Sequence, residues 1–195
     1  VPRPRLALHP RAAGKAGVVM ALLEASDLVK HFVAARNLFG RPTAFVQAVD
    51  GVSFHVEAGE TLALVGESGC GKSTIAKAIL GILPQGARVT GSMRLDGREL
   101  TGLPPSELRR IRWRDIALIP QNAMNGFDPV YTIEKQLDEA IAAHTEMPSV
   151  ERAKRIADLF AMVGLSSARL KDYAHQFSGG MRQRAMIAMA LALDP

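Results

Sequence analysis

The stretch Gly66-Glu67-Ser68-Gly69-Cys70-Gly71-Lys72-Ser73-Thr74 decides the fold of this chain of 195 residues. It fits the phosphate-loop pattern G-x-x-x-x-G-K-S/T, which needs a buried strand before it and a helix after it. Residues 61–65 are an apolar run with the length and composition of a buried strand. Residues 72–83 repeat apolar side chains at helical spacing, and Pro84 ends the pattern. The sequence therefore predicts a strand, a glycine-rich turn and a helix, which together indicate a nucleotide-binding loop.

The glycine residues of this loop allow the chemistry that the pattern implies. Gly66, Gly69 and Gly71 let the backbone turn tightly, so that successive amide groups can point at phosphate oxygens. The helix that starts at Lys72 adds its unpaired amide groups and the positive end of its dipole. We expect Lys72 to reach the β- and γ-phosphates of ATP and the Ser73 hydroxyl to ligate Mg²⁺. The predicted cofactor-binding residues of the loop are Gly66, Ser68, Gly69, Cys70, Gly71, Lys72, Ser73 and Thr74.

The net charge of +5 is concentrated at one end of the chain. Residues 1–19 carry four basic residues and no acidic one, which leaves 20 basic and 19 acidic residues in the remainder. A nearly neutral body argues against nucleic acid as a partner. The longest apolar run, residues 185–193, is far too short to cross a bilayer, so a membrane role would be peripheral. A local basic cluster fits a solvated helix face better than a partner-binding patch; it consists of Arg109, Arg110, Arg112 and Arg114.

Cys70 is the only cysteine, so no internal disulfide can form, which fits a reducing cytoplasm. A small residue that fits the loop is the favoured interpretation of Cys70, and a thiol activated by the helix N-terminus is the alternative. Residues 1–19 are rich in Pro, Arg and Ala and have no apolar segment typical of a signal peptide. We expect a disordered extension there, ahead of a domain over residues 20–195, with Met20 as the more natural first residue.

Patterns on both sides of the loop predict an α/β fold whose sheet is part antiparallel and part parallel. Strands are expected at 22–32, from 49 to 56 and at 92–95, the last entering a tight turn at Asp96-Gly97. A loop is expected at 34–43, a turn at 57–60 and a helix at 105–112. Residues 116–119 are expected to form another buried strand, which Pro120 ends just before Gln121.

The second half of the chain is expected to be mainly helical. An amphipathic helix is expected to begin after the helix cap Thr132, and a second is expected between Ser149 and Gly164, which would end it. Together they predict a small helical insertion. After this insertion, Ser178 is suited to the N-cap position of a helix. The two glycines that follow Ser178 would leave the backbone exposed at the start of that helix. This arrangement is a possible second anion site. Taken alone, an ordinary capped helix is the favoured interpretation.

The order of these features resembles the ATP-binding subunits of ABC transporters. A phosphate loop, Gln121 after an apolar run, helices and then Ser178-Gly179-Gly180 follow one another from about residue 22 to residue 195. Phe177 and Met181 depart from the general family signature Leu-Ser-Gly-Gly-Gln but resemble the dipeptide/oligopeptide importer group. Other stretches resemble the same group; they are Ala48-Val49-Asp50-Gly51-Val52-Ser53-Phe54 and Pro129-Val130-Tyr131-Thr132-Ile133.

The resemblance implies a P-loop ATPase core with an antiparallel β subdomain and a helical subdomain over about 122–178. It implies that Gln121 senses Mg²⁺ and the γ-phosphate. It implies that the signature binds ATP held by a second ATPase subunit; the residues concerned are Ser178, Gly179, Gly180, Met181 and Gln183. An aromatic residue that stacks on adenine is also implied, and Phe45 is the candidate, with core packing an equally good interpretation.

The same resemblance implies partners and a location. Two ATPase subunits would enclose two ATP molecules and dock on membrane permeases at the cytoplasmic face of the inner membrane. An extracytoplasmic substrate-binding protein would act through those permeases. The expected cargo is a dipeptide, an oligopeptide or a related solute.

The family continues beyond the signature into a Walker B aspartate and a catalytic glutamate, which do not occur before residue 195. Asp194 lacks a preceding aliphatic strand and fits the end of the signature helix instead. We therefore expect the 195 residues alone to bind nucleotide without appreciable hydrolysis. Two alternatives stay open, a non-catalytic nucleotide-binding module and the ATPase head of a DNA-repair protein. The second would need a long coiled coil between Gln121 and Ser178, and no sustained heptads occur there.

Overall fold

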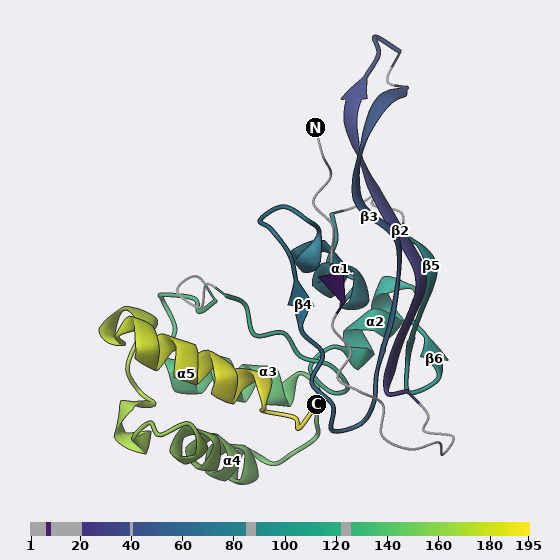
Figure 1. Cartoon of the computed structure of the whole chain (residues 1–195). Coiled ribbons are helices and arrows are strands. Elements are labelled where there is room, and N and C mark those ends of the chain that lie inside the picture. The colour runs from purple at the N-terminus through teal and green to yellow at the C-terminus, as the bar shows by residue number, and fades with distance from the viewer. Residues whose placement is uncertain (1–6, 9–20, 40, 85–88, 122–125) are drawn as a thin grey trace. The chain divides into compact units, whose positions relative to one another are not determined.

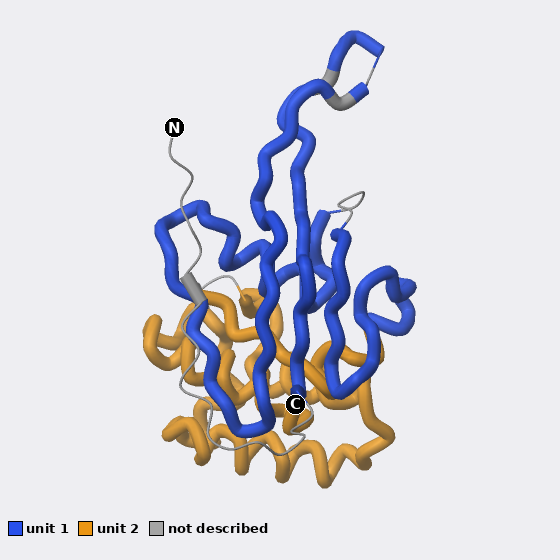
Figure 2. The backbone as a smooth tube through the Cα atoms, turned by 45° about the vertical axis from the view of Figure 1, so that its right-hand side comes forward, with its two compact units in different colours: residues 1–108 blue, residues 109–195 orange. Residues whose placement is uncertain are grey.

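The computed structural model describes residues 7–8, 21–39, 41–84, 89–121 and 126–195. These residues form two compact units, 1–108 and 109–195, each shown in its own colour in Figure 2. Ala7–Leu8 fall within the stretch expected to be disordered and form strand β1, whereas the rest of residues 1–20 lies outside the described residues. No helix within the described ranges is long and apolar enough to cross a membrane.

The first unit is built on an antiparallel sheet with the strand order β3-β2-β5-β6 (Figure 1). The strands are β2 (Leu23–Arg36), β3 (Pro42–Val56), β5 (Val89–Leu95) and β6 (Arg98–Glu99). The buried apolar side chains of these strands include Ala25, Leu28, Val49 and Met93. Strand β2 is central near its start, because Leu23 pairs with Val56 on one side and with Leu95 on the other.

The β2–β3 hairpin is longer than the sequence predicts. Strand β2 continues to Arg36 and β3 begins at Pro42, so the loop expected over 34–43 is wrong except at its centre. The ladder continues through pairs such as Val33–Phe45 and Ala35–Ala44. A proline is tolerated as the first residue of a strand, so it does not end the ladder as it would in a strand interior.

Two short turns agree with the prediction. Glu60 N donates to Glu57 O at 3.1 Å in the turn at 57–60. In the turn between β5 and β6, Asp96 and Gly97 have φ of 48° and 73°. Two successive left-handed residues are the geometry of a two-residue hairpin turn, which Asp-Gly favours.

Strand β6 carries a glutamate that ties it to its neighbour. The Glu99 carboxylate accepts hydrogen bonds from Ser92 Oγ at 2.5 Å, from Met93 N at 3.0 Å and from Thr101 N at 3.0 Å. Burial acts to raise the pKa of Glu99, but these hydrogen bonds outweigh it and lower that pKa to about 2.

The two buried strands that the sequence predicts, one before the phosphate loop and one before Gln121, are largely absent. Residues 116–119 form only a single bridge, between Ile116 and Arg112, and Leu118 and Ile119 are 41% and 44% exposed. Only β4 (Leu64–Val65) forms within 61–65, and it pairs antiparallel with β1 (Ala7–Leu8). An apolar run becomes a strand only where a neighbour completes its hydrogen bonds. Among the described residues, parallel pairing is confined to the bridge at Ile116.

Helix α1 (Lys72–Ile79) begins as predicted but ends earlier than Leu83. Gly81 has a φ of 60°. Its amide donates to Ala78 O at 3.0 Å, and the amide of Ile82 donates to Lys77 O at 3.0 Å. This pair of bonds is the Schellman closure that a left-handed glycine makes possible. Gly81, rather than Pro84, therefore stops the helix.

The second unit is helical, and helix α2 (Pro105–Ile111) spans the boundary at residue 108. Helices α3 (Ile133–Ala142), α4 (Ser149–Met162) and α5 (Gly179–Ala190) pack together, with 3₁₀ turns at Ser167–Arg169 and Ala174–Gln176. Their apolar faces form one core; it includes Ile133, Leu137, Ile141, Ile156, Leu159, Phe160, Ala185 and Ala188. The predicted cap Thr132 and the terminator Gly164, with a φ of 67°, are both confirmed.

Helices α4 and α5 cap each other's C-terminal ends through arginine side chains. Arg155 of α4 donates to Leu191 O at 3.1 Å and to Ala192 O at 3.3 Å, beyond the end of α5. Arg184 of α5 donates to Gly164 O at 2.7 Å, beyond the end of α4. Each cation also lies at the negative end of the other helix dipole. Asp194 pairs with Arg155 at 2.5 Å, just past the end of α5, which agrees with its expected place.

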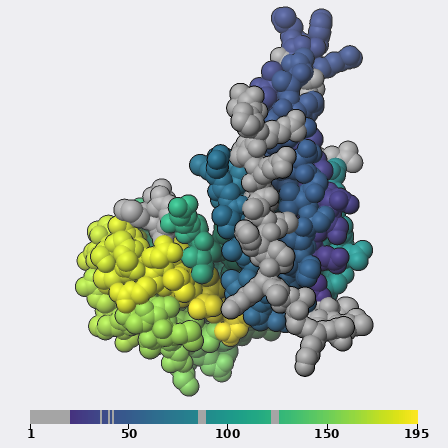
Figure 3. Space-filling model, viewed as in Figure 1, coloured from purple at the N-terminus to yellow at the C-terminus, as the bar shows by residue number. Residues whose placement is uncertain are grey.

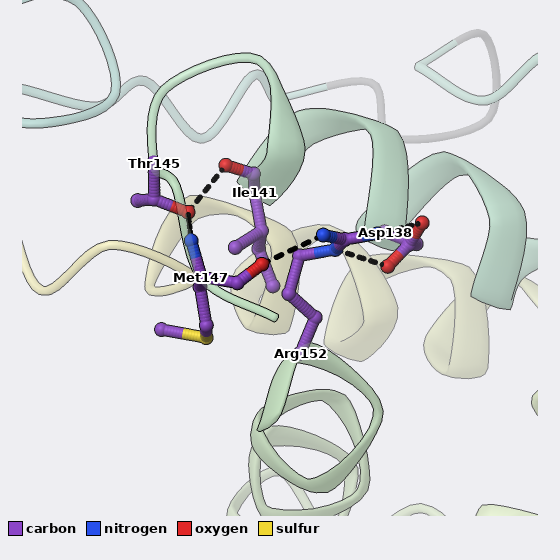
Figure 4. A network of polar contacts seen from close by, with 5 residues as sticks. All are labelled: Asp138, Ile141, Thr145, Met147 and Arg152. Atoms are coloured by element: carbon purple, nitrogen blue, oxygen red, sulfur yellow. Dashed lines mark hydrogen bonds and ion pairs between the residues drawn. The ribbon is translucent and has the colours of Figure 1, made fainter. Parts of the chain in front are cut away.

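Helices α3 and α4 are joined by a second polar network, shown in Figure 4. Arg152 donates to Asp138 through Nε at 2.6 Å and Nη2 at 3.1 Å, and through Nη1 to Met147 O at 2.7 Å. Thr145 Oγ1 donates to Ile141 O at 2.9 Å in the connecting segment. Hydrogen bonding to Arg152 lowers the pKa of Asp138 despite burial, and the same contact raises the pKa of Arg152.

Candidate nucleotide-binding site

The phosphate loop connects β4 to α1 and presents unpaired amide groups at the helix start. The first bond of the helix runs from Ile75 N to Gly71 O at 3.0 Å. The amides of Lys72, Ser73 and Thr74 come before it and have no partner within the helix, as at any helix N-terminus. Gly71 is the N-cap residue with a φ of 101°. This combination of amides and helix dipole suits a phosphate group.

Gly71 lies so close to β3 that no side chain fits. A Cβ at this position would be 2.1 Å from the carbonyl oxygen of Ala48. In the ladder, Val49 pairs with Lys30 and Gln47 pairs with His31, so Ala48 is an extra residue on β3. Such a β-bulge redirects the backbone. The bulge at Ala48 therefore brings the β3 backbone against the phosphate loop, a contact that sequence reasoning missed.

The ammonium group of Lys72 is folded back onto the loop itself. Nζ donates to Gly66 O at 2.8 Å, to Glu67 O at 2.7 Å and to Cys70 Sγ at 3.3 Å. Cys70 is half-buried, and its sulfur accepts one of the hydrogen bonds of the lysine. The positive charge is held at the centre of the loop, where a phosphate would need it.

The donor set of the loop fits a nucleotide that brings its own metal ion. The Ser73 residue is exposed at the helix start, so its hydroxyl can serve as a single oxygen ligand. The described ranges contain no group of three or more His, Cys, Asp or Glu residues suited to a metal ion. Mg²⁺ is commonly held by one or two protein groups together with substrate phosphates and waters. The residues present therefore suit Mg²⁺ bound through phosphate oxygens.

The predicted second anion site lies at the start of α5, in the other unit. Ser178 is the N-cap residue, and its Oγ accepts from Met181 N at 3.3 Å. A Cβ on Gly179 or Gly180 would meet nothing within 4 Å. Packing within the described chain therefore does not require either glycine. Met181 is half-buried and packs against the helical core.

The remaining predicted site residues are more scattered. Gln121 is exposed in the second unit, directly before residues 122–125, which lie outside the described residues. Gln183 is half-buried on α5. Phe45 lies on β3 opposite Val33 with 57% of the residue exposed. The phosphate loop residues are therefore brought together within the first unit, whereas Gln121 and the signature residues belong to the second.

Comparison with known proteins identifies the family. The pattern of the family described as ABC transporter matches residues 49–195. This chain belongs to the ABC transporter family. Among curated relatives, this ABC transporter chain is 46% identical over 154 residues to the dipeptide transport ATP-binding protein DppD of Bacillus subtilis, a match that covers 77% of this chain and 46% of DppD. It is 41% identical over 177 residues to the oligopeptide transport ATP-binding protein OppD of Escherichia coli, covering 90% of this chain and 50% of OppD.

Solved structures support the same assignment. The dimeric structure of MJ0796, a bacterial ABC transporter cassette, has a TM-score of 0.72 and 25% identity, and the match covers 89% of this chain and 70% of that one. A second structure of MJ0796, with the same scores, is a post-hydrolysis state bound to ADP and Pi. The ABC transporter chain described here spans about half the length of DppD and OppD.

Proposed function

We propose that this ABC transporter chain is the ATP-binding part of a subunit that powers import of dipeptides, oligopeptides or a related solute. The observation that carries the proposal is the phosphate loop, which combines the N-terminus of α1 with the Lys72 ammonium held against the loop carbonyls. The identity to DppD and OppD directs the proposal to peptide transport. The cargo itself would be recognised by other components of the transporter.

The loop residues would act by positioning and electrostatics. The helix amides and Lys72 would bind the β- and γ-phosphates, and the Ser73 hydroxyl would ligate Mg²⁺ carried by the nucleotide. The metal ion would neutralise phosphate charge, which is the chemistry that it supplies to phosphoryl transfer. Gln121 would sense the metal and the γ-phosphate, and the Phe45 ring, being more than half exposed, is free to stack on adenine. Hydrolysis is proposed for the whole subunit.

The start of α5 would serve a nucleotide held by a second ATPase subunit. Ser178 and the open glycines Gly179 and Gly180 provide an approachable helix N-terminus with no phosphate loop of its own. The dimeric assembly of MJ0796 supports this arrangement by analogy. Two subunits would close on two ATP molecules, and the closure would be passed to membrane permeases at the cytoplasmic face of the membrane. A substrate-binding protein outside the membrane would deliver the cargo.

The test separates nucleotide binding from pairing of subunits. Ser178→Ala removes a group expected to contact only the partner's nucleotide, so MgATP binding by each subunit should persist while ATP-dependent dimerisation is lost. Ser166→Ala is the matched control, because Ser166 caps a 3₁₀ turn in the same unit through a bond from Ala168 N at 3.3 Å. Both changes remove a cap, which costs about 1 kcal/mol. Titration calorimetry and light scattering with the full-length subunit measure the two properties.

The outcomes distinguish the proposal from a non-catalytic nucleotide-binding module. ATP-dependent dimers that survive in Ser178→Ala as well as in Ser166→Ala would contradict the assignment of the second site. Nucleotide binding with no ATP-dependent dimer in the unmodified protein would favour the binding module.

A further inference from the structure

The described residues of the turn between β2 and β3 are joined by hydrogen bonds and carry two exposed apolar side chains. Asn37 Oδ1 accepts from Phe39 N at 3.0 Å and from Arg41 N at 2.9 Å, and Asn37 N donates to Arg41 O at 2.9 Å. Within this bonded turn, Leu38 is 103% exposed and Phe39 is 89% exposed. They are the two most exposed large apolar residues in the described ranges. The turn therefore holds an apolar tip, formed by Leu38 and Phe39, out in solvent.

The hairpin that carries this tip extends beyond the rest of its sheet. Among the residues that the structure describes, β5 pairs with β2 only as far as Lys30, and beyond it β2 pairs with β3. Figures 1 and 3 show the free end of the hairpin standing clear of the other strands of the first unit. A two-stranded hairpin with no third strand or helix against it is marginally stable in water. The tip therefore lies beyond the last described residue of β2 that pairs with β5.

The charge of this segment has a single sign. Residues 28–49 contain Lys30, Arg36 and Arg41 but no Asp or Glu, although the chain from residue 20 onward is nearly neutral. Lys30 is only 3% exposed, so the exposed Arg41 supplies positive charge near the tip. Arg36 precedes the turn, and the exposed Arg41 follows it. Residues 28–49 thus combine exposed apolar side chains with positive charge and contain no acidic residue.

We infer that the tip of the β2–β3 hairpin binds the surface of an anionic lipid bilayer. Leu38 and Phe39 would insert into the interface between headgroups and acyl chains, while Arg41 stays at the level of the phosphates. Basic residues next to a membrane are attracted by anionic lipids, and apolar insertion adds to that attraction. A convex tip with no acidic group favours a lipid surface over a protein partner, which would offer a shaped pocket and mixed charges.

This contact does not depend on the nucleotide site. The ABC transporter chain would then contact the membrane directly, in addition to any contact with permeases. Each arginine near an anionic surface contributes roughly fivefold in binding, and each inserted apolar side chain contributes on the order of tenfold.

The test uses the purified full-length protein and sucrose-loaded vesicles in a sedimentation assay. We expect binding to vesicles of phosphatidylcholine and phosphatidylglycerol, weaker binding at high salt, and little binding to phosphatidylcholine alone. The double change Leu38→Ser and Phe39→Ser should weaken binding by more than tenfold. Arg41→Glu should weaken it by at least fivefold and reduce the salt dependence.

A matched control is available on the second unit. Val150 and Met162 are 80% and 65% exposed on helix α4, so Val150→Ser with Met162→Ser removes comparable exposed apolar surface elsewhere and should leave vesicle binding unchanged. Circular dichroism and MgATP binding check that the variants stay folded. Equal vesicle binding by the tip variant and the control would overturn the inference. Absence of binding to anionic vesicles by the unmodified protein would also overturn it, and loss of permease association in the tip variant would then identify a protein partner.

Discussion

Gly71→Ala offers a direct test of how the phosphate loop is held against the sheet. The new Cβ would lie 2.1 Å from Ala48 O, whereas real Cβ contacts are essentially never shorter than 3.0 Å. The neighbouring atom is a backbone oxygen within β3, so the loop or the strand must move by about 0.9 Å, the difference between those two distances. The φ of 101° adds strain that only glycine avoids.

A second glycine of the same loop separates strain from collision. Gly69 has a φ of 84°, and a Cβ there would meet nothing within 4 Å. Alanine in a left-handed conformation costs about 1–2 kcal/mol, partly offset by the lower entropy of the unfolded chain. We therefore expect Gly69→Ala to lower the free energy of unfolding by about 1 kcal/mol. Gly71→Ala bears the strain and the collision together, and we expect a loss of about 3 kcal/mol or more.

The assay is urea unfolding of the nucleotide-free full-length protein, followed by circular dichroism and with the slope compared between variants. Measuring without nucleotide keeps phosphate contacts out of the comparison. If the two alanine variants unfold within about 1 kcal/mol of each other, the close approach of Gly71 to Ala48 does not constrain the loop, and the structural argument fails.

Three further predictions concern polar groups outside the phosphate loop. The pKa of Glu99 is lowered to about 2 from 4.5, so its stabilising contribution is complete above pH 4.5 and disappears as the pH falls toward 2; urea unfolding of the unmodified protein and Glu99→Gln should therefore differ at pH 7 and converge near pH 2. Asp138→Ala leaves the Arg152 side chain, 18% exposed, without its carboxylate, and should lower the free energy of unfolding by about 1–3 kcal/mol in thermal or urea unfolding. The control Asp115→Ala removes an exposed ion pair and should lower it by less than about 0.5 kcal/mol. Equal losses in the two variants would contradict a stabilising role for the Asp138–Arg152 network. Arg155→Met keeps the aliphatic stem but removes the donors to the end of α5, and hydrogen exchange in the last turn of that helix should accelerate; unchanged exchange would show that the arginine does not cap it.

Local chemistry made several elements predictable from the sequence. Thr132 and Ser178 begin helices because their side chains accept from backbone amides three residues later. Gly164 ends α4 because it adopts a left-handed φ without strain. The glycine-rich loop and the start of α1 at Lys72 followed from the same kind of rule. In each case the responsible interaction lies within a few residues of the signal.

The failures involve partners that are distant in the sequence. Residues 116–119 are as apolar as a buried strand, but an apolar run says nothing about whether a neighbouring strand is available to pair with it. The length of the β2–β3 ladder depends on pairing across the hairpin, which outweighed the Pro42 signal for a loop. The contact between Gly71 and the Ala48 bulge joins two elements that are far apart in the chain. Its only sequence signal was a glycine that the phosphate-loop pattern already explained.

The folded-back lysine changes how a mutation at the loop would have to be interpreted. With its three hydrogens already committed to two carbonyls and a sulfur, Lys72 must exchange partners when a phosphate arrives, so measured affinity is a difference between two satisfied states. Deleting the ammonium would remove attraction for the ligand and, at the same moment, release the oxygens that it tethers. A lower affinity for phosphate would therefore combine the loss of a positive charge with the loss of hydrogen bonds that hold the loop. Calorimetry of both the ligand-free and the ligand-bound protein would be needed to separate the two effects.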